Sequence, residues 1–228
     1  MDERHEKEIE SIKERYAKRK QNTQNYDILL IASLYTVNER EIVYARIIKD
    51  FFGDDLSEKK IIEIGAGSGS NLLHFHRLGF KWENIYANEL LDDRYSVLRE
   101  RLPNSTCIRG DASKLDYANE FDVVFQSTVF TSILDKNFRK ILAEKMFEML
   151  KPGGIIISYD FTYNNPQNKD VMKLTKKDII NLFADHRGIS FKKVTLAPPI
   201  SRRIGRLYDV ANFFFPFLRT HLIAVIKK

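Results

Sequence analysis

The stretch Ile61-Ile62-Glu63-Ile64-Gly65-Ala66-Gly67-Ser68-Gly69 is an apolar run that leads straight into three closely spaced glycines. Such a run predicts a buried strand, a tight turn and then a helix, which we expect over residues 70–77. Glycine permits positive φ and a close approach of the backbone to a ligand, and the first N–H groups of the helix stay free to bind one. A dinucleotide fingerprint would need G-x-G-x-x-G, but Ser70 stands at its last position. The turn therefore predicts a ligand site without identifying the ligand.

Short apolar runs alternate with amphipathic stretches on the C-terminal side of this turn. The predicted strands cover residues 61–64, 85–87, 106–108, 122–125 and 154–159, and the predicted helices cover residues 70–77, 93–101 and 137–150. Alternation at this spacing predicts an α/β fold in which helices cover both faces of a parallel sheet. Farther on, we expect a helix over 176–183, a strand over 190–196, a break at Pro198 and Pro199, a helix over 201–215 and a last strand over 221–226.

Two helices are predicted ahead of the sheet. Residues 1–21 are mostly charged, with a thin apolar stripe of Ile9, Ile12 and Tyr16. A second helix is expected over residues 37–52, with Asn38 as its cap and Gly53 as its stop. We therefore divide the chain into an N-terminal helical extension, residues 1–56, and a main domain, residues 57–228, of which residues 161–228 contribute to the substrate side.

The composition limits the classes of protein. Hydrophobic residues make up 43% and charged residues 30% of the 228 residues, which is enough to bury a core. The only cysteine is Cys107, so internal disulfides and multi-cysteine metal sites are excluded, and we expect no metal. A reduced, cytoplasmic setting is the default, and the charged first residues are unlike a signal peptide.

Positive charge is concentrated near the C-terminus. Lys and Arg number 37 against 31 Asp and Glu, which gives a net charge of +6. Residues 187–228 hold nine basic residues and only one acidic residue, Asp209. Such a segment fits an anionic substrate, a nucleic acid or a membrane surface, or it is an ordinary solvated surface.

Five segments, in order, resemble the motifs of the class I S-adenosylmethionine-dependent methyltransferases. They are the glycine-rich stretch, Ile85–Glu89, Gly110-Asp111-Ala112, Phe121–Gln126 and Leu150-Lys151-Pro152-Gly153-Gly154. The resemblance implies a Rossmann-like, seven-stranded, mostly parallel sheet with helices on both faces and an antiparallel last strand. It also implies S-adenosylmethionine as the cofactor, S-adenosylhomocysteine as the product, and an N-terminal extension that covers the cofactor site.

Roles for the cofactor site follow from the same resemblance. Glu89 stands where an acidic side chain accepts hydrogen bonds from ribose hydroxyls, and Asp111 could accept one from the adenine amine. The glycine turn would pass close to the amino-acid portion of the cofactor, with Glu63 beside it. Glu63 and Glu89 could instead simply end strands on the solvated side. The expected cofactor-binding residues are Tyr35, Arg40, Glu63, Gly65, Ala66, Gly67, Ser68, Glu89, Leu90, Asp111, Ala112 and Gln126.

Two features of nucleobase methyltransferases are absent from the sequence, which argues against a nucleobase as the methyl acceptor. Adenine and cytosine amino-methyltransferases resemble one another in N/D-P-P-Y/F after the fourth strand, whereas this chain has Gln126-Ser127-Thr128-Val129. Cys107 lies in the third predicted strand, and cytosine C5-methylation needs a cysteine near the fourth or fifth. Several C-terminal segments resemble a bacterial subgroup associated with surface-polysaccharide gene clusters, which implies O-methylation of a sugar or sugar-linked group. These segments are 126–134, 160–161, 165–166, 182–183, 194–203 and 218–222.

A hydroxyl acceptor must lose its proton, so a nearby base is expected. Ligands sit beyond the carboxyl ends of parallel strands, and there Asp160 is the first choice, with His74 and His221 behind it. Asp160 could equally be a structural residue that binds the next loop. Arginine suits phosphate or carboxylate, which points to an anionic acceptor. The expected substrate-binding residues are Thr128, Asn165, Arg202, Arg203 and Arg219.

Other functions stay open. An RNA methyltransferase could use the basic C-terminal segment, although its basic residues are spread among apolar ones instead of forming a stripe with stacking aromatics. A cofactor-binding scaffold without catalysis is another alternative. The aromatic run over residues 211–218 is expected in the core or as a substrate lid rather than on a membrane. We therefore expect a small-molecule or glycan acceptor and no nucleic-acid partner.

Overall fold

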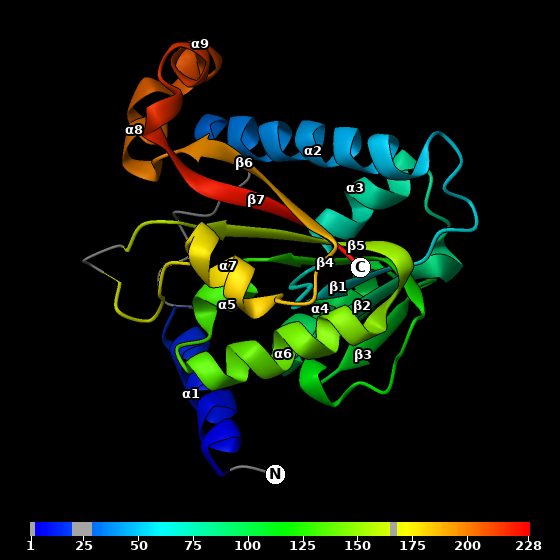
Figure 1. Cartoon of the computed structure of the whole chain (residues 1–228). Helices are drawn as coiled ribbons and strands as arrows, with labels where there is room; N and C mark the ends of the chain where they lie inside the picture. Colours follow the sequence, from blue (N-terminus) through cyan, green and yellow to red (C-terminus); the bar gives the residue numbers. More distant parts are fainter. Residues whose placement is uncertain (1–2, 20–28, 165–167) are drawn as a thin grey trace.

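Seven strands form one sheet at the centre of the protein, as a computed structural model shows (Figure 1). The structure describes residues 3–19, 29–164 and 168–228. The strands are β1 (Ile61–Ile64), β2 (Ile85–Glu89), β3 (Thr106–Arg109), β4 (Phe121–Ser127), β5 (Leu150–Phe161), β6 (Gly188–Leu196) and β7 (Arg219–Lys227). Their order is β3-β2-β1-β4-β5-β7-β6, and β7 runs antiparallel to both of its neighbours while the other pairs are parallel. The expected α/β fold with an antiparallel last strand is confirmed.

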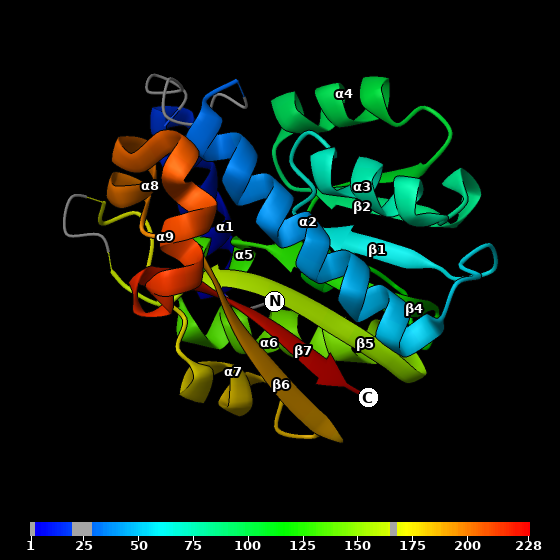
Figure 2. The ribbon, with the colours of Figure 1, turned by 90° about the horizontal axis from the view of Figure 1, so that it is seen from above.

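Helices cover both faces of this sheet (Figure 2). One face carries α2, α3 and α4, and the other carries α5, α6 and α7, with α1 against the same side as α6. The α-helices are α1 (Glu3–Arg19), α2 (Ile31–Phe52), α3 (Ser70–Leu78), α4 (Asp92–Arg101), α5 (Val129–Ser132), α6 (Lys136–Met149), α7 (Lys176–Leu182), α8 (Pro198–Ile204) and α9 (Tyr208–Phe214). Short 3₁₀ helices are η2 (Trp82–Asn84), η3 (Ala112–Lys114), η4 (Gly205–Leu207) and η5 (Pro216–Leu218).

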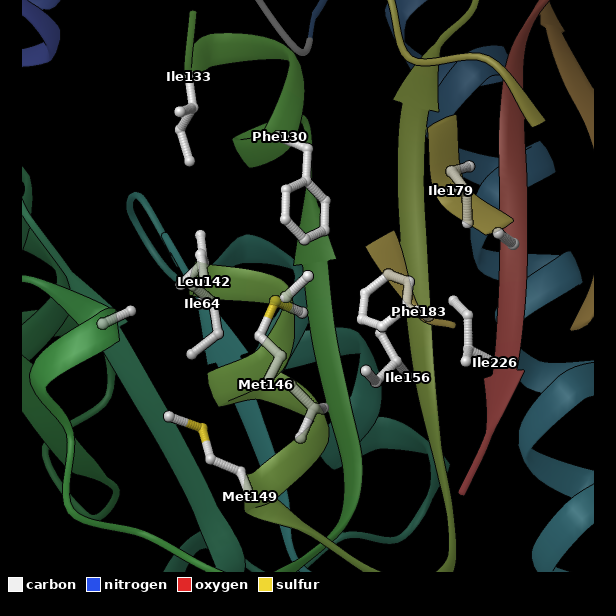
Figure 3. Close-up of a cluster of buried hydrophobic side chains, with 14 of the residues drawn as sticks. Ile64, Phe130, Ile133, Leu142, Met146, Met149, Ile156, Ile179, Phe183 and Ile226 are labelled. Carbon is white, nitrogen blue, oxygen red and sulfur yellow. The ribbon is translucent and has the colours of Figure 1, made fainter. Parts of the chain in front are cut away.

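Each face of the sheet has its own hydrophobic core. Because successive strand side chains point to opposite faces, Ile62 and Ile64 lie in the core under α6, while Ile61 lies in the core under α2. Figure 3 shows the first of these cores, where Met146 and Phe183 face the sheet. Both faces are buried, which explains why the strands read as continuous apolar runs.

Two helix predictions need correction. Helix α2 begins at Ile31, so Asn38 lies inside it and is not its cap, although Gly53 does end it with a φ of 74°. The helix expected over residues 201–215 is broken at Gly205, whose φ is 50°, into α8 and α9. Pro198 starts α8 instead of only breaking the chain, because proline fits the first turn of a helix. Among the described residues, no helix is long and apolar enough to cross a membrane.

Candidate functional site

A cavity of about 120 Å³ opens at the carboxyl ends of β1 to β4. Gly65, Glu89, Asp111 and Thr128 line it from the sheet side. Its opposite wall is α1, which contributes three side chains, those of Ile9, Ile12 and Tyr16. Pockets that enclose a small molecule usually measure roughly 300–1,000 Å³, so side chains of α1 fill part of the space at this sheet edge. The N-terminal helix and the glycine turn thus share one site.

The glycine turn is held in a conformation that side chains rarely adopt. Gly65 and Gly67 have φ values of 64° and 59°. The N–H of Gly67 donates to Glu89 Oε2 at 2.7 Å, and the N–H of Ala66 donates to the Asn88 carbonyl at 2.8 Å. A Cβ at Gly69 would lie 2.9 Å from side-chain atoms of Leu98 and Leu102. The turn therefore needs glycine both for its backbone angles and for its packing on α4.

Glu89 ends β2 with its carboxylate facing the cavity. It is 4% exposed, and its second oxygen accepts from the N–H of Leu91 at 2.9 Å. Burial raises the pKa of Glu89, and the two backbone N–H groups act in the opposite direction. Each carboxylate oxygen has two acceptor lone pairs, so both can bind a further donor. Glu89 is therefore fixed in place and still able to accept hydrogen bonds from a ligand.

Asp111 follows β3 and faces α1. Its Oδ1 accepts from the N–H of Ser113 at 2.9 Å, which caps η3, and its Oδ2 lies 2.7 Å from His5 Nε2. Leu90 and Ala112 line the cavity beside it with apolar surface. The loops after β2 and β3 thus bring the Asp111 carboxylate and the apolar side chains of Leu90 and Ala112 to the cavity wall. One oxygen of that carboxylate already contacts His5.

Unpaired polar atoms gather on the α2 side of the same sheet edge. Arg40 Nε, Tyr44 Oη and Glu63 Oε2 are buried without a hydrogen-bond partner among the described residues. The other oxygen of Glu63 accepts from Asn71 Nδ2 at 2.7 Å. Burial raises the pKa of the Glu63 carboxyl to about 8, against the effects of Asn71 and Arg40. Because buried polar atoms are normally paired, these open atoms indicate a place where a polar ligand can bind.

Asp160 does not face the cavity, contrary to the first choice for a base. It is 0% exposed, and its carboxylate accepts from Gln126 Nε2, from Ser158 Oγ at 3.0 Å and from the Thr131 N–H at 3.2 Å. Burial raises its pKa to about 6. Asp160 therefore stabilises the turn after β4 through hydrogen bonds with Gln126 and Thr131.

Gln126 is also absent from the cavity wall. Its side chain is 0% exposed, and its Oε1 accepts from the N–H of Val129 at 2.8 Å. The expected contact between Gln126 and the cofactor stays a prediction, and the Gln126 side chain fixes the start of α5. Five other expected cofactor residues do not line the cavity. They are Glu63 on β1, Ala66, Gly67 and Ser68 in the glycine turn, and Arg40 on α2.

The two histidine candidates lie on the α2 face. His74 is 6% exposed on α3, with Nδ1 3.3 Å from Glu41 Oε2, and it does not line the cavity. His221 starts the inner part of β7 and is partly buried, with its ring stacked on Tyr159 at a centroid distance of 5.1 Å. Burial, and then Arg40, lowers the pKa of His221 to about 4. His221 is therefore a neutral imidazole at neutral pH, and Arg40 lies over the same Tyr159 ring at 4.8 Å.

Only one of the expected substrate residues lines the cavity, namely Thr128, whose φ is 62°. Arg219 is turned toward α9, with Nε 2.8 Å from Asn212 Oδ1, and so braces the C-terminal helices. Arg202 and Arg203 are exposed on α8. Asn165 lies outside the described residues. Tyr35 stacks on Tyr208 at 5.6 Å, which joins α2 to α9 instead of reaching the cavity.

The side chains that the sequence did not assign to the site come mainly from α1, α5 and α6. The apolar stripe Ile9, Ile12 and Tyr16 was the one available signal, since an amphipathic helix must bury its stripe somewhere. Further lining residues on α5, on α6 and between these two helices are Val129, Ser132, Ile133, Phe138 and Leu142. Their periodicity predicts a core face and carries no sign of the cavity.

Comparisons with known proteins agree with this geometry. Residues 62–158 match a family model described as a methyltransferase domain. A protein-L-isoaspartate O-methyltransferase of Thermosipho melanesiensis is 32% identical over 111 residues, which are 45% of this chain and 51% of that protein. A phthiotriol/phenolphthiotriol dimycocerosates methyltransferase of Mycobacterium tuberculosis is 32% identical over 114 residues, 49% of this chain and 41% of that protein. The matched part of the chain spans about half the length of these curated relatives.

Solved structures share the fold at low sequence identity. An S-adenosylmethionine-dependent methyltransferase of Thermotoga maritima superposes with a TM-score of 0.61 at 14% identity, covering 95% of this chain and 98% of that one. A Burkholderia thailandensis 1,6-didemethyltoxoflavin-N1-methyltransferase with bound S-adenosylhomocysteine gives 0.60 at 16% identity, covering 84% and 80%. Residues 62–158 therefore resemble a methyltransferase domain, and the chain has the fold of the class I S-adenosylmethionine-dependent methyltransferases.

Proposed function

We propose that this chain is an S-adenosylmethionine-dependent methyltransferase that methylates a hydroxyl of a sugar or another small molecule. One observation carries the cofactor assignment. Arg40 Nε and Glu63 Oε2 are buried without a hydrogen-bond partner among the described residues. The amino-acid portion of S-adenosylmethionine carries a carboxylate, which would pair with Arg40, and an ammonium group, which would favour the ionised form of Glu63 on binding.

The rest of the cofactor fits the cavity residues. In this proposal Glu89 accepts hydrogen bonds from the ribose hydroxyls, and Asp111 accepts one from the adenine amine. Leu90 and Ala112 bracket the base with apolar surface. Gly65 and Gly67 keep side chains out of the path between the two ends, since neither has a Cβ. The residues present therefore fit this cofactor along its whole length.

Bound S-adenosylmethionine supplies a methyl group on a sulfonium, so that transfer forms an oxygen–carbon bond, breaks the sulfur–carbon bond and leaves S-adenosylhomocysteine. The chain must hold the acceptor in line and take its proton, and positioning accounts for much of such a rate. We propose His221 as the group that takes this proton, although it lies outside the cavity lining, because burial keeps its imidazole neutral. Asp160 and His74 have structural roles in this proposal, because Asp160 accepts three hydrogen bonds from within the protein and His74 lies against Glu41.

The choice of a hydroxyl rests on the acceptor side of the site. The turn after β4 is Gln126-Ser127-Thr128-Val129, which lacks the N/D-P-P-Y/F sequence of amino-methyltransferases. A neutral imidazole has a free lone pair that can accept a hydroxyl proton as the methyl group is transferred. The named relatives differ in their acceptors, and one of them is an O-methyltransferase. The resemblance of the C-terminal segments to a polysaccharide-associated subgroup favours a glycan or nucleotide sugar as the acceptor.

Transfer of an isotope-labelled methyl group tests this proposal. The purified chain is incubated with labelled S-adenosylmethionine and parallel panels of nucleotide sugars, glycans, phenols, isoaspartyl peptides and RNA. We expect label in a sugar hydroxyl, and we expect His221→Asn to lower kcat by about a hundredfold while cofactor affinity stays unchanged. Label only in RNA, or on a nitrogen or carbon atom, would contradict O-methylation. Full activity of the His221 variant would remove this residue as the base.

A further inference from the structure

Exposed apolar side chains are concentrated at one end of the molecule. In the part of the chain that the structure describes, fifteen large hydrophobic side chains are exposed, and ten of them come from residues 29–34 and 207–217. Leu29 is 80% exposed, Phe213 77% and Phe217 70%. The sequence favoured the core or a lid for the phenylalanines, but Phe213, Phe214, Phe215 and Phe217 all lie on the outside. We call this set of ten side chains the apolar tip.

The two segments of the apolar tip lie together in space. In both views α8 and α9 sit beside the first turns of α2, where residues 29–34 are found (Figures 1 and 2). The phenylalanines are also paired with one another, since Phe213 packs edge-on against Phe214 at 5.0 Å and Phe215 against Phe217 at 6.0 Å. Exposed apolar side chains gathered in such number at one place mark an interaction site.

Unpaired positive charge borders the apolar tip. Arg202, Arg203 and Arg206 are exposed on α8 and η4, and none of them makes an ion pair or a hydrogen bond with a residue that the structure describes. The only acidic residue between 187 and 228 is Asp209. Apolar rings next to exposed arginines match the interfacial region of an anionic bilayer, where rings enter the acyl boundary and cations meet the headgroups.

We propose that the apolar tip docks this protein on the surface of an anionic lipid bilayer. A second copy of the chain is a poorer occupant, because a symmetric contact would bring the same three arginines of both copies together. The tip also lies at the carboxyl edge of the sheet, since α8 and α9 connect the end of β6 to the start of β7. Docking by this surface would turn the edge that carries the cavity toward the lipid.

Vesicle binding tests the proposal independently of methyl transfer. The full chain is floated with vesicles of phosphatidylcholine plus phosphatidylglycerol, and with vesicles of phosphatidylcholine alone. We expect binding to the anionic vesicles that weakens as salt is added. The triple variant Phe213→Ser, Phe214→Ser, Phe217→Ser and the triple variant Arg202→Gln, Arg203→Gln, Arg206→Gln should each lose at least about tenfold in apparent affinity.

A matched control removes exposed apolar side chains elsewhere. Val97→Ser with Ile180→Ser alters residues that are 43% and 45% exposed and lie outside the tip, and it should bind as the wild type does. Melting curves establish that every variant is folded. The proposal is overturned if the wild type does not bind anionic vesicles, or if the tip variants bind as well as the control. It is also overturned if sedimentation shows a dimer that the phenylalanine variant abolishes, with no vesicle binding.

Discussion

The helices α1 and α2 approach the same sheet edge from opposite faces, but they leave their polar groups in opposite states. On α1, His5 pairs with Asp111 at 2.7 Å and Arg15 pairs with Glu8 at 2.9 Å. On α2, Arg40 and Tyr44 each keep a buried polar atom without a partner among the described residues. Burying an unpaired polar group is costly, so the α2 side is less stable as it stands.

This difference divides the site into a closed end and an open end. On the α1 side, the carboxylate of Asp111, which we propose as a cofactor ligand, already has a partner in His5, and apolar side chains line the cavity. On the α2 side, Arg40 Nε and Glu63 Oε2 have no hydrogen-bond partner among the described residues, and the two groups interact only electrostatically. We infer that cofactor affinity comes mainly from the α2 side and that α1 must share or release its contacts.

The largest effect on cofactor affinity is expected from a substitution on the α2 side. Arg40→Ala should weaken S-adenosylmethionine binding by about a hundredfold, because the carboxylate of the ligand would lose a cation that is held in a desolvated place. Calorimetric titration measures the change. Arg46→Ala, an exposed position on the same helix, is the matched control and should bind normally. Equal affinities for the two variants would show that α2 does not contact the ligand.

A smaller effect is expected on the free energy of unfolding when Glu63 is replaced. The pKa of Glu63 is about 8 in the folded chain against an ordinary 4.5, so folding holds a proton that the unfolded chain releases, and stability falls as the pH rises between these values. Glu63→Gln removes this loss and keeps an acceptor for Asn71. The variant should be more stable than the wild type at pH 8, on the order of 1 kcal/mol, and its advantage should shrink toward pH 4.5. Melting curves of the unliganded proteins decide this, and a constant difference across that range would contradict it.

The smallest effect on cofactor affinity is expected from a substitution on the α1 side. His5→Ala frees Asp111 Oδ2 for a ligand donor, so S-adenosylmethionine affinity should rise by a few-fold, roughly the worth of one hydrogen bond. Titration under the conditions used for Arg40→Ala measures it, with Glu3→Ala, an exposed position on α1, as the control. A clear loss of affinity in the His5 variant would mean that α1 completes the site and does not compete for it.

Local patterns predicted most strands and helices of the fold. The run from Ile61 to Gly69 predicted β1, its turn and α3, and the ends of the next strands led to Glu89 and Asp111. These residues could be found because parallel strands bring their carboxyl ends to one edge. The seven-stranded sheet with its antiparallel last strand, and the roles of Glu89 and Asp111, came from the resemblance to the class I methyltransferases.

Long-range contacts explain what the sequence missed. Asp160 ends a strand at the right edge, but three donors from β4, α5 and β5 enclose it, and no local pattern shows them. Arg219 was expected at a substrate, yet Asn212 on α9 binds it. The stripe of α1 predicted a buried face without showing that this face closes a cavity. A run of phenylalanines reads alike in a core and on a surface, so the apolar tip was visible only in the fold.

The most direct test of the account is calorimetric titration of the unliganded protein with S-adenosylmethionine and S-adenosylhomocysteine. Glu89→Ala is the test variant, and Glu83→Ala, an exposed acid on η2, is its matched control. We predict micromolar binding by the wild type and the control, and at least tenfold weaker binding by folded Glu89→Ala, on the order of the loss of two charged hydrogen bonds. Absence of binding by the folded wild type, or equal binding by the Glu89 variant, would contradict the assignment of this site to the cofactor.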